Sequence, residues 1–169
     1  MKQQWERLEA WLETHNPVLL ADLNPPASDA DIRELEQKLG VKLPMDFVEC
    51  LKVHDGQREK SGWLFDGKEF MSTRNILMSW SAWGDLLEDG DFDGKISRPV
   101  IGIQSGWWIK EWVPFATNGS GDYLCIDLSP SGNGNSGQVI KVFHDVPDRT
   151  LDAICFSAWF DRFVGSKQA

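Results

Sequence analysis

Two histidine–aspartate pairs, His54-Asp55 and His144-Asp145, are the residues of this chain best suited by type to acid–base chemistry. A carboxylate can orient an imidazole so that the ring takes up or releases a proton during a reaction. Residues that are adjacent in sequence usually point in different directions, so neither pair by itself predicts such an arrangement. Ser120 does not lie in a nucleophile elbow either, because Asn-Gly precedes it and Gly-Asp follows it. We therefore predict no catalytic residue.

The turns that contain these residues are instead expected to be structural. Glycine supplies backbone torsions that other residues avoid, and Asn and Asp side chains form hydrogen bonds with nearby backbone groups. Two clusters have this composition, His54-Asp55-Gly56 and Asn118-Gly119-Ser120-Gly121-Asp122. We predict that both hold the ends of strands in place.

The segment Asp89-Gly90-Asp91-Phe92-Asp93-Gly94 is the best match to a metal site. Aspartate at its first, third and fifth positions and glycine at its sixth match a calcium-binding loop. The twelfth position should carry a bidentate glutamate, but it is Val100, and Pro99 precedes it. We expect a solvated acidic turn, with weak cation binding as the alternative. The sequence predicts no resident metal or cofactor.

The tract Gly132-Asn133-Gly134-Asn135-Ser136-Gly137 has the glycine spacing of a dinucleotide-binding loop. In that loop a strand delivers the glycines onto the N-terminus of a helix, which holds the pyrophosphate. Here the tract precedes Gln138-Val139-Ile140-Lys141-Val142, which has the composition of a strand. We therefore reject nucleotide binding and expect a long hairpin loop.

Length and charge restrict the remaining function classes. The chain has 169 residues and a formal net charge of −9, which indicates one acidic domain over residues 1–169. An acidic surface repels phosphate, so nucleic acid is not an expected partner, whereas a basic protein is favoured. No apolar run is long enough for a membrane helix. The three cysteines are widely spaced and lack a CxxC pair, so we expect buried, reduced thiols in a cytoplasmic protein. The oligomeric state does not follow from these features.

Helices are expected at both ends of the chain and in its middle. Apolar residues recur at helical spacing, Ser28 suits a helix N-cap, and Gly40 suits a helix stop. Pro44 suits the first turn of the next helix. The pattern predicts helices over 2–14, between Ser28 and Gly40, from Pro44 to near 54–56, over 73–87 and over 151–164.

Strands are expected where short apolar runs are bounded by turn residues. Such runs lie at 107–115, 123–128 and 138–143, and weaker ones lie at 63–65 and 69–71. Helices followed by a meander of strands and then by a final helix predict an α+β fold with an antiparallel sheet.

Five groups of residues occur along the chain in a characteristic order. The first runs from Pro26-Ala27-Ser28 through Ile32, Leu35, Glu36, Leu39-Gly40, Leu43-Pro44 and Phe47 to His54-Asp55-Gly56. The others are Trp112-Val113-Pro114-Phe115-Ala116, Asn118 to Asp122, Leu124-Cys125-Ile126-Asp127, and Gly137-Gln138-Val139-Ile140 with His144-Asp145. Together with the aromatic-rich C-terminal helix, they resemble the SUKH superfamily over residues 25–164, and residues 1–23 add an N-terminal helix.

The resemblance implies an α+β domain with a central, mostly antiparallel sheet packed by helices. Bacterial members of this superfamily typically act as immunity proteins that neutralise polymorphic toxins, many of them nucleases, and fungal members regulate the cell wall and signalling. No catalytic residue is attributed to the superfamily as a class. We therefore expect a non-enzymatic protein-binding module, with an immunity protein against a basic toxin domain as the main hypothesis. The alternatives are a regulatory scaffold in cell-wall or signalling control and, third, a small enzyme or ligand-binding protein.

Two clusters outside the matched groups are candidates for the partner-binding face. The first, which we call the acidic loop, would attract a basic toxin; its acidic residues are Asp85, Glu88, Asp89, Asp91 and Asp93. The second is Trp107-Trp108. Neighbouring residues on a strand face opposite ways, so at most one of these rings is buried and the other is a candidate interface anchor. The alternative is that the loop only aids solubility and both rings are buried.

Overall fold

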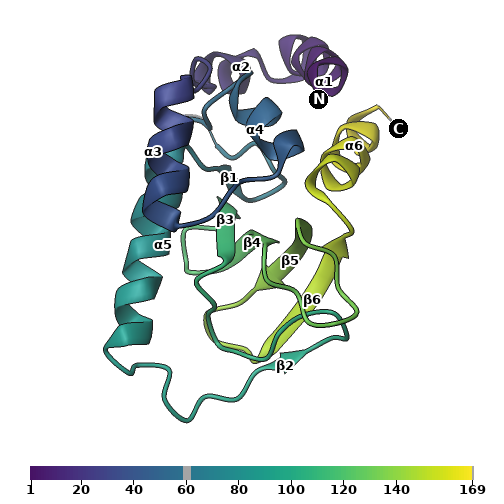
Figure 1. Cartoon of the computed structure of the whole chain (residues 1–169). Coiled ribbons are helices and arrows are strands. Elements are labelled where there is room, and N and C mark those ends of the chain that lie inside the picture. The colour runs from purple at the N-terminus through teal and green to yellow at the C-terminus, as the bar shows by residue number, and fades with distance from the viewer. Residues whose placement is uncertain (59–61, 169) are drawn as a thin grey trace.

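The computed structural model describes residues 1–58 and 62–168 and shows helices packed around a central sheet (Figure 1). The helices in these ranges are α1 (Lys2–His15), α2 (Pro17–Asp22), α3 (Asp29–Leu39), α4 (Met45–Leu51), α5 (Thr73–Glu88) and α6 (Phe156–Lys167). The strands are β1 (Glu69–Phe70), β2 (Arg98–Pro99), β3 (Trp112–Thr117), β4 (Tyr123–Asp127), β5 (Gln138–Val142) and β6 (Asp148–Ala153). The predicted α+β class is confirmed.

The strands form one mostly antiparallel sheet in the order β1-β3-β4-β5-β6-β2. Only the short β2 is parallel to its neighbour, β6. Strands β3 and β4 are buried along their whole length. Helices α3 and α5 run along one side of the sheet, and α1, α2 and α4 lie beyond one end of it (Figure 1). The edge formed by β6 and β2 faces away from α3 and α5.

Local signals place the long helices correctly. The Ser28 hydroxyl accepts a hydrogen bond from the Asp31 backbone N–H at 3.1 Å, and the Asp31 carboxylate accepts one from the Ser28 N–H at 2.9 Å. This reciprocal capping box fixes the start of α3. Gly40 ends the helix with a φ of 70°, a left-handed torsion that glycine adopts without strain. The helix predicted over 73–87 is confirmed as α5.

The predictions for the weaker elements are wrong in several places. Residues 63–65 lie in a turn region rather than in a strand. The run at 107–115 becomes a strand only from Trp112, because residues 109–112 turn through a hydrogen bond from the Trp112 N–H to the Ile109 carbonyl at 2.9 Å. Pro44 is the N-cap of α4 rather than its first residue, and the helix ends at Leu51. Helix α2 and strand β2 were not anticipated.

The largest error concerns the expected helix over 151–164. Its first residues belong to β6, which pairs with β5 at Ile140↔Leu151 and Val142↔Arg149. The helix itself, α6, starts only at Phe156. The sheet therefore extends beyond residue 143, where the sequence pattern had ended it.

The core joins the helices to one face of the sheet through aromatic side chains. Phe65 packs edge-on against Trp159 and Phe163, and Phe115 packs edge-on against Phe156. Edge-to-face contacts between rings add to the free energy gained by burial. Cys50 and Cys125 are buried free thiols, as expected, whereas Cys155 is only half-buried.

In the part of the chain that the structure describes, no helix combines the length and the apolar composition that a bilayer span requires.

Candidate partner-binding surface and supporting turns

The turn at Asp55 joins the N-terminal helices to α5. The Asp55 carboxylate accepts hydrogen bonds from the backbone N–H of Thr73 at 2.7 Å and from its hydroxyl at 2.9 Å. Burial raises the pKa of Asp55, although these two hydrogen bonds act in the opposite direction. An acceptor at the N-terminus of α5 satisfies a backbone donor that the helix itself leaves free. This geometry supports a structural role for Asp55.

His54 links three segments through both nitrogens of its ring. Nδ1 lies 2.7 Å from the Asn24 carbonyl oxygen, and Nε2 lies 2.7 Å from a carboxylate oxygen of Glu9 in α1. Both partners are hydrogen-bond acceptors, so the ring bridges two segments that are distant in the sequence. The imidazole therefore connects α1 and the 24–26 segment to the end of α4. Its two hydrogen-bond partners do not include the Asp55 carboxylate, so the two residues do not form an acid–base pair.

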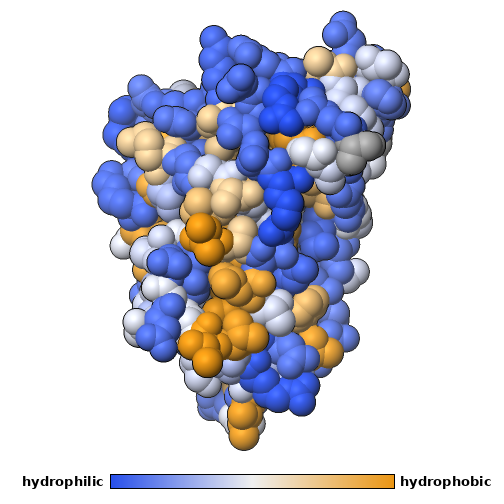
Figure 2. Space-filling model, turned by 90° about the vertical axis from the view of Figure 1, so that its right-hand side faces the viewer, coloured by the Kyte–Doolittle hydropathy of each residue, from blue (hydrophilic) through white to orange (hydrophobic). Residues whose placement is uncertain are grey.

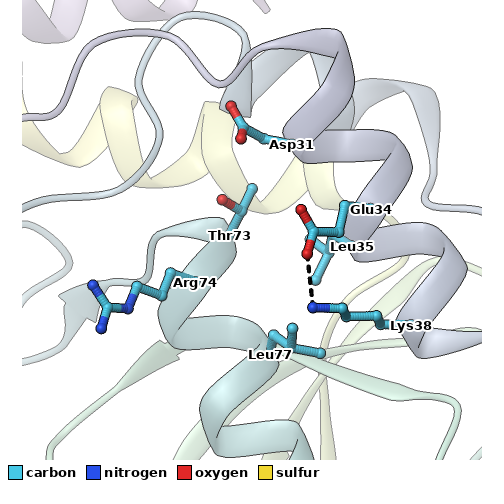
Figure 3. Close-up of a pocket in the computed structure, with 7 residues that line it drawn as sticks. All are labelled: Asp31, Glu34, Leu35, Lys38, Thr73, Arg74 and Leu77. Carbon is cyan, nitrogen blue, oxygen red and sulfur yellow. Dashed lines mark ion pairs between the residues drawn. The ribbon is translucent and has the colours of Figure 1, made fainter.

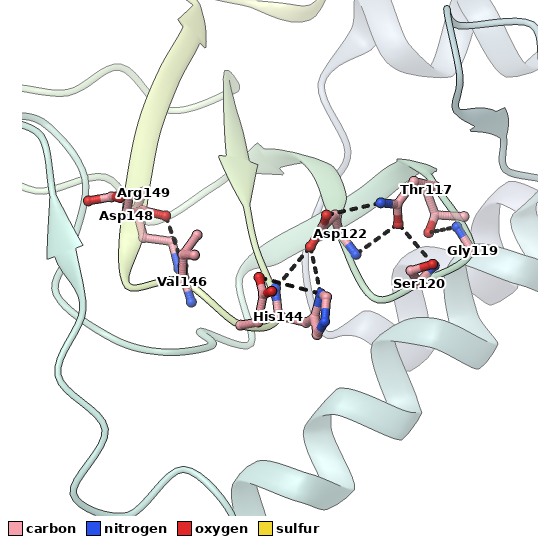
Figure 4. A network of polar contacts seen from close by, with 10 residues as sticks. Thr117, Gly119, Ser120, Asp122, His144, Val146, Asp148 and Arg149 are labelled. Atoms are coloured by element: carbon pink, nitrogen blue, oxygen red, sulfur yellow. Dashed lines mark hydrogen bonds and ion pairs between the residues drawn. The ribbon is translucent and has the colours of Figure 1, made fainter.

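The second turn cluster connects two loops of the sheet (Figure 4). The Asn118 side-chain oxygen accepts hydrogen bonds from the backbone of Ser120 and Asp122, and its amide donates to the Asp122 carboxylate at 2.9 Å. The Gly119 N–H donates to the Thr117 hydroxyl. The Asp122 carboxylate also accepts from the His144 backbone at 3.0 Å and lies 2.8 Å from Nδ1 of the His144 ring. The partner of His144 is thus Asp122, which is distant in sequence, and Asp145 lies farther away at 3.8 Å.

The Asp122–His144 pair is expected to stabilise the protein within a limited pH range. Its hydrogen bond to Asp122 raises the pKa of His144, so this contribution is complete below about pH 6.5 and is lost as the pH rises through the raised value. Burial raises the pKa of Asp122, but the hydrogen bonds with His144 outweigh burial and leave this pKa below its ordinary value. The contribution of Asp122 is therefore lost only when the pH falls through the lowered pKa. In urea denaturation, the stability difference between wild type and His144→Ala should be larger at about pH 5.5 than at about pH 9.

The control for this experiment is His15→Ala. His15 stacks on Trp11 and lies near no carboxylate within ion-pair distance among residues 1–58 and 62–168. Its effect on stability should therefore vary less between the two pH values. Equal differences for His144→Ala at both pH values would show that the pair contributes nothing through its charge.

Atoms of the types that can bind a metal lie close together at this same place rather than at the acidic loop. Within the described ranges, one group of three possible ligands lies close together, and its atoms from Asp122, His144 and Asp145 all lie within 4.8 Å of one another. The His144 nitrogen and the Asp122 oxygen in this group already bind each other. Asp89, Asp91 and Asp93 form no such group, so the resemblance of that segment to a calcium loop is not matched by converging ligands.

The structure distinguishes the two tryptophans that the sequence offers as interface anchors. Trp108 is only 2% exposed and packs against Trp83 and Trp112, so a partner cannot reach it. Trp107 is half-buried, with the Lys95 ammonium 4.9 Å from its ring centroid and the Arg149 guanidinium carbon also 4.9 Å away. Only Trp108 is therefore fully buried, and Trp107, although two cations flank its ring, remains the candidate anchor of the pair.

The acidic loop comprises the last turn of α5, with Asp85 and Glu88, and the residues that follow it. Its Glu88 carboxylate binds Lys110 at 2.6 Å, which lowers the pKa of Glu88. Asp85, Asp89, Asp91 and Asp93 have no Lys, Arg or His within ion-pair distance in the described ranges. The loop therefore presents several uncompensated negative charges to solvent.

A group of exposed aliphatic side chains, absent from the sequence prediction, lies on the edge formed by β6 and β2. Figure 2 shows apolar side chains gathered on this face of the molecule. We define the apolar surface by four exposed residues on or next to β6 and β2: Val100 is 42% exposed, Ile101 84%, Leu151 44% and Ile154 62%. Single exposed aliphatic residues are common, but a contiguous patch often marks an interaction site. One sequence signal could have indicated this surface: the aliphatic pair Val100-Ile101 precedes Gly102, and side chains in a turn are often exposed to solvent.

A groove between α3 and α5 is a weaker candidate (Figure 3). Its volume is about 260 Å³, and its walls include Leu35, Leu77 and an ion pair between Glu34 and Lys38 at 2.7 Å. The groove is small, and the charges of Glu34 and Lys38 are already paired with each other, so it offers a ligand few free polar groups to bind.

Comparisons with known proteins agree with the fold. The SMI1 / KNR4 family (SUKH-1) matches residues 26–162. The cell wall assembly regulator SMI1 of Saccharomyces cerevisiae is 24% identical, over 98% of this chain and 40% of its own length. The glucan synthesis regulatory protein of Neurospora crassa is 23% identical, over 83% of this chain and 33% of its own length. The cell wall biosynthesis/cell cycle regulator smi1 of Schizosaccharomyces pombe is 29% identical, over 86% of this chain and 32% of its own length.

The chain thus spans 32% to 40% of the length of these curated relatives. The family match, by contrast, covers most of the chain, including the capped helix α3, both turn clusters and the central strands. The chain therefore belongs to the SMI1 / KNR4 family (SUKH-1).

Proposed function

We propose that this chain is a protein-binding regulatory domain that acts in the control of cell-wall assembly or a related signalling process, without catalysis of its own. The observation that carries this proposal is the apolar surface together with the unpaired charges of the acidic loop. Exposed apolar area surrounded by polar groups is typical of protein interfaces. The two His-Asp pairs, by contrast, are engaged in holding turns and helices.

The names of the relatives favour one of the two binding functions expected from the sequence. The three relatives described above are regulators of the cell wall, of glucan synthesis or of the cell cycle. This supports the regulatory scaffold over the immunity protein. In either case a basic protein partner suits the net charge of −9. The matched region accounts for less than half of each relative, so in those proteins it would supply one binding surface of a larger regulator.

A domain exchange in S. cerevisiae tests the proposal. The part of the yeast regulator that matches this chain is replaced by the chain, and growth is measured on a dye that binds cell-wall glucan. We expect the chimera to tolerate more dye than a strain that lacks the gene. The triple change Asp89→Asn, Asp91→Asn and Asp93→Asn should reduce this tolerance, because it weakens attraction to a basic partner.

An equal change of charge elsewhere provides the control. Glu6→Gln, Glu13→Gln and Glu34→Gln remove three exposed negative charges from α1 and α3, and tolerance should then stay near that of the unmodified chimera. A chimera that accumulates to the normal level but grows no better than the deletion strain would refute the regulatory function.

A further inference from the structure

We propose that the apolar surface is the docking site for a basic partner segment that carries apolar side chains and also reaches the acidic loop. This inference rests on the proposed function and specifies the chemistry of the partner. Four observations support it: how rigidly the apolar side chains are presented, how large the surface is, which charges lie next to it, and how the sheet edge is built.

The backbone holds the exposed side chains in fixed positions. The Val100 N–H donates to the Arg149 carbonyl at 3.0 Å, which ties the chain after β2 to β6. The Gly102 carbonyl accepts hydrogen bonds from the Ser131 N–H and from the Gln138 side chain at 2.9 Å. Ile101 lies between these two anchored residues, so its exposure is a property of the folded turn. A pre-organised apolar group loses little entropy when a partner covers it.

The size of the surface suits the centre of an interface. Four partly exposed aliphatic side chains present on the order of a few hundred Å² of apolar area, which is the scale of an interaction patch. A stable interface needs about 800 Å² on each partner. The remaining area must therefore come from the neighbouring surface, and the charge of that surface decides which partner fits.

The neighbouring charge favours a basic partner over a second copy of this chain. Val100 lies seven positions after Asp93, so a bound segment that reaches both spans roughly 24 Å at most. Exposed Ile96 lies on the connecting chain, which runs beneath the sheet to β2 (Figure 1). Two copies would each bring a net charge of −9 and repel each other, whereas a cationic segment would be attracted to the loop.

The sheet edge favours contact through side chains rather than addition of a strand. Strand β2 pairs with only Asp148 and Arg149 of β6. Farther along, the register of β6 shifts between Leu151 and Ala153. A bulge of this kind bends an edge strand and protects it from pairing with other chains. A partner segment would therefore pack on Ile101, Leu151 and Ile154 from outside.

A peptide titration followed by NMR of the ¹⁵N-labelled protein tests this proposal. The probe has about ten alternating Lys and Val residues, long enough to reach from the loop to the apolar surface. We expect shifts at residues 96–103 and 150–155 as well as at the acidic loop. A Lys-Ser peptide should shift only the loop, and a Glu-Val peptide should shift neither region. The double variant Ile101→Ser, Ile154→Ser should bind the Lys-Val peptide at least about tenfold more weakly.

The matched control is Val18→Ser with Met78→Ser, which removes two similarly exposed apolar side chains from α2 and α5. This variant should bind the Lys-Val peptide like wild type. Equal binding by the Ile101/Ile154 variant would overturn the proposal. So would self-association of wild type in sedimentation that Ile101→Ser abolishes, because the occupant would then be a second copy. If the yeast chimera works while the peptide test fails, only this docking site is refuted.

Discussion

Replacing Gly56 by alanine is expected to destabilise the protein by about 3–5 kcal/mol, combining left-handed backbone strain with overpacking. Gly56 has a φ of +69°, and a β-carbon there would lie 2.3 Å from the backbone nitrogen of Ser72 and 2.6 Å from the carbonyl carbon of Met71. Both neighbours are backbone atoms at the start of α5, so neither can rotate away. The loss is a large part of the roughly 5–15 kcal/mol that stabilises a typical domain.

Gly40→Ala separates the two causes. Gly40 has nearly the same torsion, a φ of +70°, but a β-carbon there meets no atom within 4 Å. It should therefore cost only about 1–2 kcal/mol, the strain of the left-handed torsion alone. Urea denaturation of both variants measures the difference. If the two alanine variants lose the same stability, the 54–56 turn relaxes away from α5, and its proposed role in fixing that helix is wrong.

Helix ends could be predicted from the sequence because their signals are local. Ser28 and Asp31 form a capping box across four consecutive positions, and Gly40 supplies a torsion that few other residues tolerate. Such features depend on neighbouring residues alone. The Asn118 turn belongs to the same class, since Asn118 satisfies donors only two to four residues away. The partners of His54 and Asp55, by contrast, lie 18 or more positions away in the sequence.

Strand β6 could not be predicted because its neighbours define it. Its sequence, Asp-Arg-Thr-Leu-Asp-Ala, alternates poorly, and Leu151 and Ile154 fit the helical spacing of the following residues. Pairing with β5 overrides this weak preference. The same tertiary pairing determines that Leu151 is exposed. The apolar surface could therefore not be predicted from the periodicity of apolar residues.

Only one part of the candidate site, the acidic loop, could therefore be predicted from the sequence. The acidic loop could be found because four unpaired aspartates within nine residues are a matter of composition. The exposure of a tryptophan or an isoleucine depends instead on which segments cover it. Trp108 is covered by Trp83 of α5, whereas Ile101 is covered by nothing among residues 1–58 and 62–168.

Arg149→Ala is expected to destabilise the protein by about 3 kcal/mol, through a cavity and the loss of hydrogen bonds. Arg149 is fully buried and donates to the carbonyls of Val146 and Asp148 at 2.9 Å and of Trp107 at 2.7 Å. Figure 4 shows this side chain beside the β5–β6 connection. Burial lowers the pKa of its guanidinium to about 10, with weaker opposing effects from Cys125 and Asp148. A buried cation held by carbonyls thus joins β6 to the 107–111 segment.

Two further variants identify the cause of this loss. Arg162→Ala removes an exposed arginine that pairs with Asp152 at 3.1 Å, and should cost at most about 1 kcal/mol. Arg149→Met fills most of the space without donors and should fall between wild type and Arg149→Ala, because it restores packing and removes a charge that is costly to bury. The measurement is again the midpoint of urea denaturation. A loss for Arg149→Ala as small as that for Arg162→Ala would mean that water replaces the guanidinium easily. The 107–111 segment would then be held mainly by the contacts of the Trp108 ring with Trp83 and Trp112 and by the contact of Lys95 with the Trp107 ring.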